Sequence, residues 1–179
     1  KGLYKFRAAD APKNKPRIHL FGSDAILREA LAAQEVLAEK FGVAADVWSA
    51  TSYTMLRREA LACERWNLLH PEDAPRVPYV AKVLAEEPWP IVATGDYMKA
   101  VPDQIARWVP QGLYSLGTDG FGRSESRVDL RDYFEINSRY VTVAALRELV
   151  RTGKFDKKKL SAAYKIMEIN PNKFDHASA

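Results

Sequence analysis

Hydrophobic and polar positions follow two different periods along this chain. Short apolar or alternating runs, which are typical of β-strands, are separated by longer stretches in which apolar residues recur every three or four positions, as on one face of a helix. The repeated order of strand and helix predicts an α/β domain with a mostly parallel sheet. The expected strands cover residues 3–7, 17–21, 45–50, 90–94 and 113–116.

The helical stretches have recognisable ends. We expect Ser23, Asn137 and Asp156 to cap three helices, because their side-chain oxygens accept hydrogen bonds from the first free amides of a helix. Gly42 and Gly153 are expected to end two helices. The expected helices cover residues 26–41, 55–69, 77–87, 97–109, 128–134, 138–152 and 157–167.

Residues 117–127, between the last strand and the next helix, contain three closely spaced glycines, which predicts a loop. Open α/β sheets usually bind ligands or partners at the carboxyl ends of their parallel strands, where this loop lies. Arg123 and Arg127 are therefore expected to contact an anion or an interface. The alternative is a turn in which the two arginines pair with Asp119 and Glu125.

The composition narrows the class of protein. With 179 residues, 47% of them hydrophobic and 28% charged, the chain is typical of one globular domain and unlike disordered or fibrous proteins. It contains no apolar run long enough to cross a bilayer. The net charge of +4 arises at the two ends, whereas residues 18–150 are acidic. We interpret these basic ends as solvated segments; the alternative is a nucleic-acid adaptor, whose binding would weaken steeply with salt.

Common short signatures of catalysis are absent. The sequence has one cysteine and three histidines, so it forms no internal disulfide and no zinc-binding cluster of standard spacing, and a reducing compartment is expected. It contains no phosphate loop, dinucleotide fingerprint or nucleophile elbow. We expect His70 to bond the last carbonyls of its helix rather than transfer protons, and Cys63 to be a buried structural thiol rather than a reactive one. At least two of four tryptophans should lie in the core: Trp48, Trp66, Trp89 and Trp108.

Several segments together resemble the C-terminal domain of the homodimeric bacterial pyruvate dehydrogenases. They are residues 46–52, 63–67, 69–71, 75–79 and 96–99, and, most distinctively, Gly117-Thr118-Asp119-Gly120-Phe121-Gly122-Arg123-Ser124 followed by Ser126-Arg127. The resemblance extends over nearly the whole chain. Phe121, Gly122 and Ser124, followed by Phe134 and Asn137, are also similar to the closing part of transketolases, which share this domain.

This resemblance implies a three-layer sandwich with a mixed sheet of about five strands, one antiparallel edge strand and helices on both faces. It implies one domain over residues 1–179, with an edge strand and lead-in over 1–16 and a loosely ordered tail over 170–179. The upstream catalytic domains are expected in a longer parent chain. Consistent with that expectation, Lys1 is not a methionine and a strand follows it almost at once.

The resemblance also implies a function for the parent enzyme. Members of the family decarboxylate pyruvate and reductively acetylate the lipoyl group of dihydrolipoyl acetyltransferase, using thiamine diphosphate and Mg²⁺. Both are bound upstream through a Gly-Asp-Gly motif followed by an asparagine. This chain lacks that motif, since Asp119-Gly120 has no glycine before it. We therefore assign it no catalytic, cofactor-binding or metal-binding residue and expect the fragment alone to be inactive.

The implied partners are the upstream domains of the same chain, the second subunit of a homodimer and the lipoyl-bearing acetyltransferase, in the bacterial cytoplasm, with no nucleic acid and no membrane. Two alternatives remain. The chain is the corresponding domain of a transketolase or another 2-oxo acid dehydrogenase, or it is a free-standing flavodoxin-like module that binds a small ligand near residues 49–52. The candidate interface or anion-contacting residues are Asp119, Phe121, Arg123, Ser124, Ser126 and Arg127.

Overall fold

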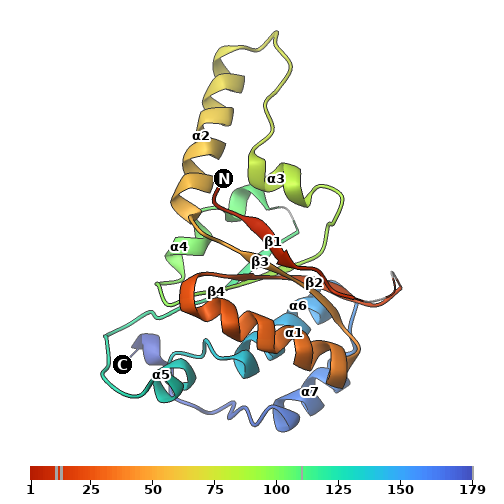
Figure 1. Ribbon diagram of the computed structural model, residues 1–179, viewed down its shortest axis with the longest axis vertical. Coiled ribbons are helices and arrows are strands. Elements are labelled where there is room, and N and C mark those ends of the chain that lie inside the picture. The colour runs from red at the N-terminus through yellow and green to blue at the C-terminus, as the bar shows by residue number, and fades with distance from the viewer. Residues whose placement is uncertain (11, 13, 110, 179) are drawn as a thin grey trace.

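The computed structural model describes residues 1–10, 12, 14–109 and 111–178 (Figure 1). Positions 11 and 13 of the expected lead-in and position 179 of the expected tail lie outside the described residues. Across the described ranges, none of the helices is both long enough and apolar enough to cross a membrane.

A five-stranded mixed sheet forms the centre of the fold, as expected. Its strands are β1 (Tyr4–Arg7), β2 (Arg17–Gly22), β3 (Ala44–Ser49), β4 (Ile91–Thr94) and β5 (Leu113–Leu116), in the spatial order β1-β3-β2-β4-β5. The edge strand β1 runs antiparallel to β3, and the other neighbours are parallel. After β2 the chain forms β3 on one side of β2, and it then crosses to form β4 on the other side of β2. The direction of winding therefore reverses at the carboxyl ends of β2 and β4, where sheets of this class commonly bind ligands.

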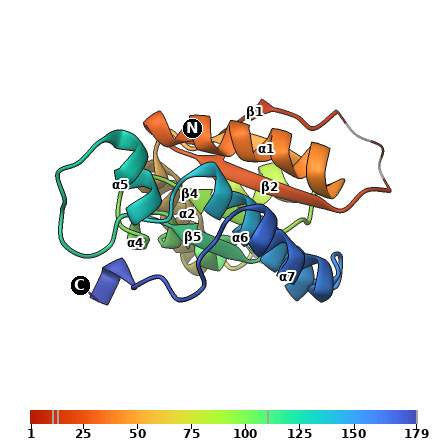
Figure 2. The same ribbon diagram turned by 90° about the horizontal axis from the view of Figure 1, so that it is seen from below.

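Helices cover both faces of the sheet (Figures 1 and 2). One face packs against α1 (Leu27–Phe41), α6 (Ser138–Arg151) and α7 (Lys157–Ile166). The opposite face packs against α2 (Tyr53–Leu69), α3 (Tyr79–Leu84) and the short helix η2 (Ala106–Trp108). The remaining short helices are η1 (Asp24–Ile26), α4 (Ala100–Asp103), α5 (Arg127–Tyr133) and η3 (His176–Ser178). The three-layer architecture is thus confirmed.

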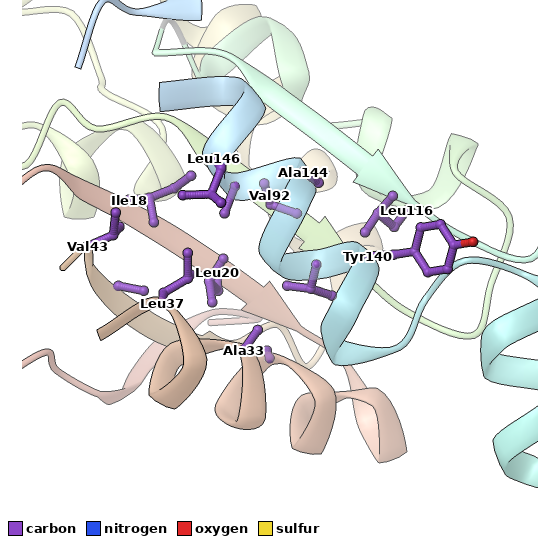
Figure 3. Close-up of a cluster of buried hydrophobic side chains, with 14 of the residues drawn as sticks. Ile18, Leu20, Ala33, Leu37, Val43, Val92, Leu116, Tyr140, Ala144 and Leu146 are labelled. Atoms are coloured by element: carbon purple, nitrogen blue, oxygen red, sulfur yellow. The ribbon is translucent and has the colours of Figure 1, made fainter. Parts of the chain in front are cut away.

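Alternation along the strands creates one hydrophobic core on each face. In β2, Ile18 and Leu20 pack with Leu37 of α1 and Leu146 of α6, and all four side chains are fully buried (Figure 3). Phe21 points to the opposite face, where it joins the cluster formed with α2 and α3. Burying a side chain of this size stabilises a fold by about 1.5–3 kcal/mol.

Most expected helix ends are confirmed, and one is wrong. The side chains of Asn137 and Asp156 accept hydrogen bonds from the first amides of α6 and α7. Gly42 ends α1 in a left-handed conformation, with φ of 65°. Ser23, by contrast, makes no capping side-chain bond. The next residue, Asp24, has a positive φ of 48°, so the chain enters a short 3₁₀ turn before α1 instead of beginning the α-helix directly.

Two predicted helices are shorter than expected. The helix expected over 97–109 is divided into α4, which holds Pro102 in its first turn, and η2. After Asp103 the amides of Ile105 and Trp108 bond the carbonyls of Pro102 and Ile105, three residues back, at 3.2 and 3.0 Å, so the chain continues in tighter turns and not as one α-helix. The helix expected over 77–87 is reduced to α3. Its start is fixed by Pro78, and beyond it the carbonyl of Glu87 bonds the amide of Trp89 at 2.7 Å in a turn.

Within the expected tail, residues 170–179, one side chain is packed against the body of the protein. His176 is only 3% exposed and packs against the rings of Tyr133 and Phe134, with centroids 6.1 and 5.5 Å away. Gly120 lies so close that a Cβ there would approach the carbonyl oxygen of His176 to 2.5 Å. His176 thus packs beside Gly120 of the glycine-rich loop, a contact between distant segments that no local sequence pattern indicates.

Candidate functional site

The base of the glycine-rich loop is held by the loop that follows β4. The amide of Thr118 donates to the carbonyl of Tyr97 at 3.0 Å, and the Thr118 hydroxyl donates to the carbonyl of Asp96 at 3.0 Å. The Asp119 carboxylate accepts a 3.2 Å hydrogen bond from the amide of Lys99 and lies 3.8 Å from its ammonium. Asp119 therefore joins two loops at the carboxyl edge of the sheet.

The rest of the loop extends away from the body of the protein before it reaches α5 (Figure 2). Phe121 is 75% exposed, and Arg123 and Ser124 are also exposed. At the end of the loop, the Ser126 hydroxyl caps α5, accepting from the amide of Asp129 at 3.2 Å and donating to its carboxylate at 2.5 Å. The structure thus separates the candidate residues into two bonded ends, Asp119 and Ser126, and exposed side chains that make fewer contacts with the body.

The two arginine side chains line different hollows. Arg123 lies 5.6 Å from the centre of the Tyr133 ring and lines a hollow of about 460 Å³ together with Ser124. Arg127 lines a neighbouring hollow of about 370 Å³, which is mostly apolar and shares Leu130 with the first. In the described part of the chain neither guanidinium forms an ion pair, so the alternative pairing with Asp119 and Glu125 is not observed. The interface role of this loop stays a prediction.

A second polar cluster lies inside the fold, at the start of the parallel strands. His19 and Asp46 are register partners in β2 and β3, and their side chains lie within 4.8 Å of Glu87, close enough to consider a shared cation. The ammonium of Lys5 already lies 2.7 Å from Glu87 and 3.4 Å from Asp46. Arg17 adds a second positive charge 3.4 Å from Asp46. The carboxylates are thus balanced by side chains, and the cluster does not fit a metal ion.

Both nitrogens of His19 are engaged in this cluster. The indole Nε1 of Trp48, which can only donate, bonds Nδ1 of His19 at 3.0 Å. The proton of His19 is therefore on Nε2, which donates to the carbonyl of Glu87 at 3.0 Å. Burial lowers the pKa of His19 below its ordinary value of 6.5, more than the nearby carboxylates raise it. Sequence reasoning missed this cluster, although a polar residue within each of two adjacent predicted strands was an available sign.

The hydroxyl-rich segment after β3 does not form a phosphate site. Ser52 caps α2 by accepting a 3.2 Å hydrogen bond from the amide of Met55. A hollow of about 300 Å³ lies beside it, lined by hydroxyl groups and by the carboxylate of Asp24, with no lysine or arginine among its described lining residues. Because a phosphate needs positive charge or several free amides, this arrangement does not favour the flavodoxin-like alternative.

The other residues singled out in the sequence have structural contacts. Nδ1 of His70 lies 3.0 Å from the carbonyl of Trp66, as expected for a histidine that ends a helix. Cys63 is a buried free thiol whose pKa is raised by burial and by its contact with Glu59. Among the tryptophans, Trp48 and Trp108 belong to the core, which confirms that expectation.

Residues 2–137 match the family model described as the transketolase-like TK C-terminal domain. The chain belongs to this family. Curated relatives of this transketolase-like domain are named pyruvate dehydrogenase E1 component. That of Escherichia coli K12 is 47% identical over 97% of this chain, that of Haemophilus influenzae is 51% identical over 86%, and that of Pseudomonas aeruginosa is 43% identical over 97%. The aligned region covers 19%, 17% and 20% of those relatives, so the chain spans about a fifth of their length.

A solved structure confirms the fold of the transketolase-like domain. The transketolase of Pichia stipitis, in complex with sedoheptulose 7-phosphate, matches 87% of this chain and 19% of its own length with a TM-score of 0.55. Its sequence identity of 19% is too low to carry more than the architecture.

Proposed function

We propose that this chain is the C-terminal domain of a thiamine-diphosphate-dependent pyruvate dehydrogenase, in which it supports interdomain and dimer contacts without supplying catalytic residues. The observation that carries the proposal is the 47% identity to the Escherichia coli pyruvate dehydrogenase E1 component over 97% of the chain. The parent enzyme decarboxylates pyruvate and passes the two-carbon unit to the lipoyl group of dihydrolipoyl acetyltransferase. Residues 1–179 form its last domain in this proposal, and the enzyme acts in the bacterial cytoplasm.

The side chains of this domain support a non-catalytic role. Asp119 is bonded to Lys99, and the cluster around Asp46 is balanced by Lys5 and Arg17. The hollow beside Ser52 has no lysine or arginine among its described lining residues. None of these places fits a diphosphate with its Mg²⁺. Thiamine diphosphate supplies the carbanion chemistry of such enzymes, and in this proposal the preceding domains hold it.

The exposed part of the glycine-rich loop is the proposed contact surface for the preceding domains or the second subunit. Phe121, Arg123 and Ser124 on the loop, and Arg127 at the start of α5, present an aromatic ring, a hydroxyl and two positive charges to the solvent. Guanidinium groups on a projecting loop are suited to ion pairs across an interface. Asp119 and Ser126 hold the two ends of this surface in place.

The proposal is tested by pyruvate decarboxylation. The remainder of the parent polypeptide is expressed without this domain and assayed with thiamine diphosphate and Mg²⁺, before and after the 179-residue chain is added. The chain alone should be inactive, and its addition should raise the activity of the remainder. A remainder that is fully active and never associates with the chain would overturn the structural role.

Arg123 provides a sharper test in the full-length enzyme. Arg123→Ala should reduce dimerisation or turnover, because it removes an exposed charge from the proposed contact surface. Lys158→Ala is the matched control, since Lys158 is an exposed cation on α7, away from the loop. Unchanged dimerisation and turnover in Arg123→Ala would remove this residue from the interface.

A further inference from the structure

The last part of α2 projects from the body of the protein. The buried residues of α2 are Tyr53, Leu56, Ala60 and Cys63, and no residue of this helix after Cys63 is buried. Glu64 still bonds Nε1 of Trp108 at 2.8 Å. Figure 1 shows the end of α2 projecting beyond the other elements, with the chain returning beside it to α3. We name residues 64–78 the arm.

Side-chain contacts link the two strands of chain that form the arm. The indole of Trp66 is covered by the ring of His70, stacked with centroids 3.6 Å apart, and by the guanidinium of Arg76, 3.4 Å from the ring centre. The side chain of Asn67 donates to the carbonyl of Arg76 at 2.9 Å and accepts from its amide at 2.7 Å. A projecting segment that is already ordered loses little conformational entropy when a partner binds.

The arm also exposes apolar side chains that the core does not use. Leu68 is 80% exposed, Leu69 53% and Val77 56%. Single exposed leucines are ordinary, but three large apolar side chains on one short projection favour a surface that is covered by another domain or subunit.

The first residues of this chain lie beside the base of the arm. The carbonyl of Gly2 accepts a 3.1 Å hydrogen bond from the amide of Ser52, and the Lys1 ammonium lies 5.1 Å from the centre of the Tyr79 ring. Lys1 therefore lies at the base of the arm, beside the first residues of α2 and α3 (Figure 1). A segment joined at Lys1 has a high effective concentration at the arm, which favours docking there over docking of a separate molecule.

We infer that the arm docks on the domain that directly precedes Lys1 in the parent chain, burying Leu68, Leu69 and Val77. This inference rests on the proposed function, which places this domain at the end of a chain about five times as long. The arm is a contact separate from the glycine-rich loop, which lies at the carboxyl edge of the sheet.

Cross-linking in the full-length enzyme tests the inference. A photo-cross-linking amino acid is placed at position 68, and dimers assembled from isotopically light and heavy subunits separate intrachain from interchain products by mass spectrometry. We expect intrachain links to the domain preceding Lys1. Links to the second subunit or to the acetyltransferase, or no protein link, would overturn the inference. The same amino acid at position 166, on α7, is the control site.

A matched pair of variants supplies a second readout. Leu69 and Ile166 are 53% and 51% exposed, respectively. Leu69→Glu should lower the thermal unfolding midpoint of the full-length enzyme but not that of the 179-residue chain, whereas Ile166→Glu should affect neither. Equal midpoints for Leu69→Glu and wild type in the full-length enzyme would contradict docking.

Pyruvate decarboxylation by the unmodified full-length enzyme is measured separately. An enzyme that is active on pyruvate but lacks the expected cross-link refutes only the docking of the arm. An enzyme that forms the intrachain cross-link but does not use pyruvate refutes only the proposed reaction.

Discussion

His19 is expected to make the free energy of unfolding decrease in mild acid. The imidazole is completely buried, and in its neutral form it accepts a hydrogen bond from Trp48 and donates one to the carbonyl of Glu87. A second proton would have to be placed on Nδ1, where it would meet the indole N–H instead of a lone pair. Burial accordingly lowers the pKa of His19 in the folded state.

The sign and size of the effect follow from proton linkage. In the unfolded chain His19 titrates near its ordinary value of 6.5, whereas the folded chain takes up this proton only at lower pH. The unfolded state therefore binds more protons between the two pKa values, and stability is lost as the pH falls through 6.5 towards the folded value. If the folded imidazole stays neutral, one pH unit below 6.5 costs at most about 1.4 kcal/mol.

Urea unfolding followed by circular dichroism measures this effect. The free energy of unfolding is compared between the 179-residue chain and His19→Gln from pH 8 to about pH 5.5, since glutamine can donate and accept hydrogen bonds but does not titrate. The difference between the two proteins should narrow as the pH falls, because only the wild type loses the His19 contribution. Parallel stability curves would refute the buried neutral imidazole.

Three further variants probe other contacts, each by urea unfolding unless stated. Tyr53→Phe should raise stability by up to about 1 kcal/mol, because the hydroxyl is buried without a hydrogen-bond partner among the described residues; a loss of stability would contradict this. Glu29→Ala should lower the free energy of unfolding by about 1.5–3 kcal/mol, because the Glu29 carboxylate accepts hydrogen bonds from a guanidinium of α5 at 2.9 Å and from an amide of α6 at 2.7 Å. Glu39 is exposed on the same helix, so Glu39→Ala should change the free energy of unfolding little. Gly120→Ala should expose the tail to limited proteolysis, because φ is 92° and a Cβ would strike a tail carbonyl; Gly122→Ala, with open space around it, should not.

The strands could be predicted from the sequence because their signals are local. Alternation over residues 17–21 and the apolar run before Gly95 locate β2 and β4 within about a residue. The capping oxygens of Asn137 and Asp156 act on amides within three residues, so their role is also local. The turn at Asp24 was not predictable in this way, because a positive φ at a residue other than glycine depends on the surrounding packing.

The position of the glycine-rich loop was predicted correctly from the sequence. The division of this loop into bonded ends and an exposed middle was not predicted. Its glycines indicate a loop, yet the attachment of Asp119 to Lys99 requires β4 and β5 to be adjacent. Likewise, the placement of Arg123 and Arg127 in different hollows depends on where α5 packs. Periodicity carries no such distance information, which explains why the arm and the cluster around His19 became visible only in three dimensions.

The strand order also constrains how the chain assembles during synthesis. The central strand β2 pairs with β3 through contacts such as Arg17 with Ala44, which emerge from the ribosome close together. The other neighbour of β2 is β4, which pairs through contacts such as His19 with Ile91. The sequence separation of this pair is between two and three times that of Arg17 and Ala44. Closing the longer loop costs about 0.9 kcal/mol more in chain entropy. The first three strands with α1 can therefore form early, whereas the free side of β2 stays unpaired until α2 and α3 have been made. Aggregation of nascent chains would be expected to begin at that open edge.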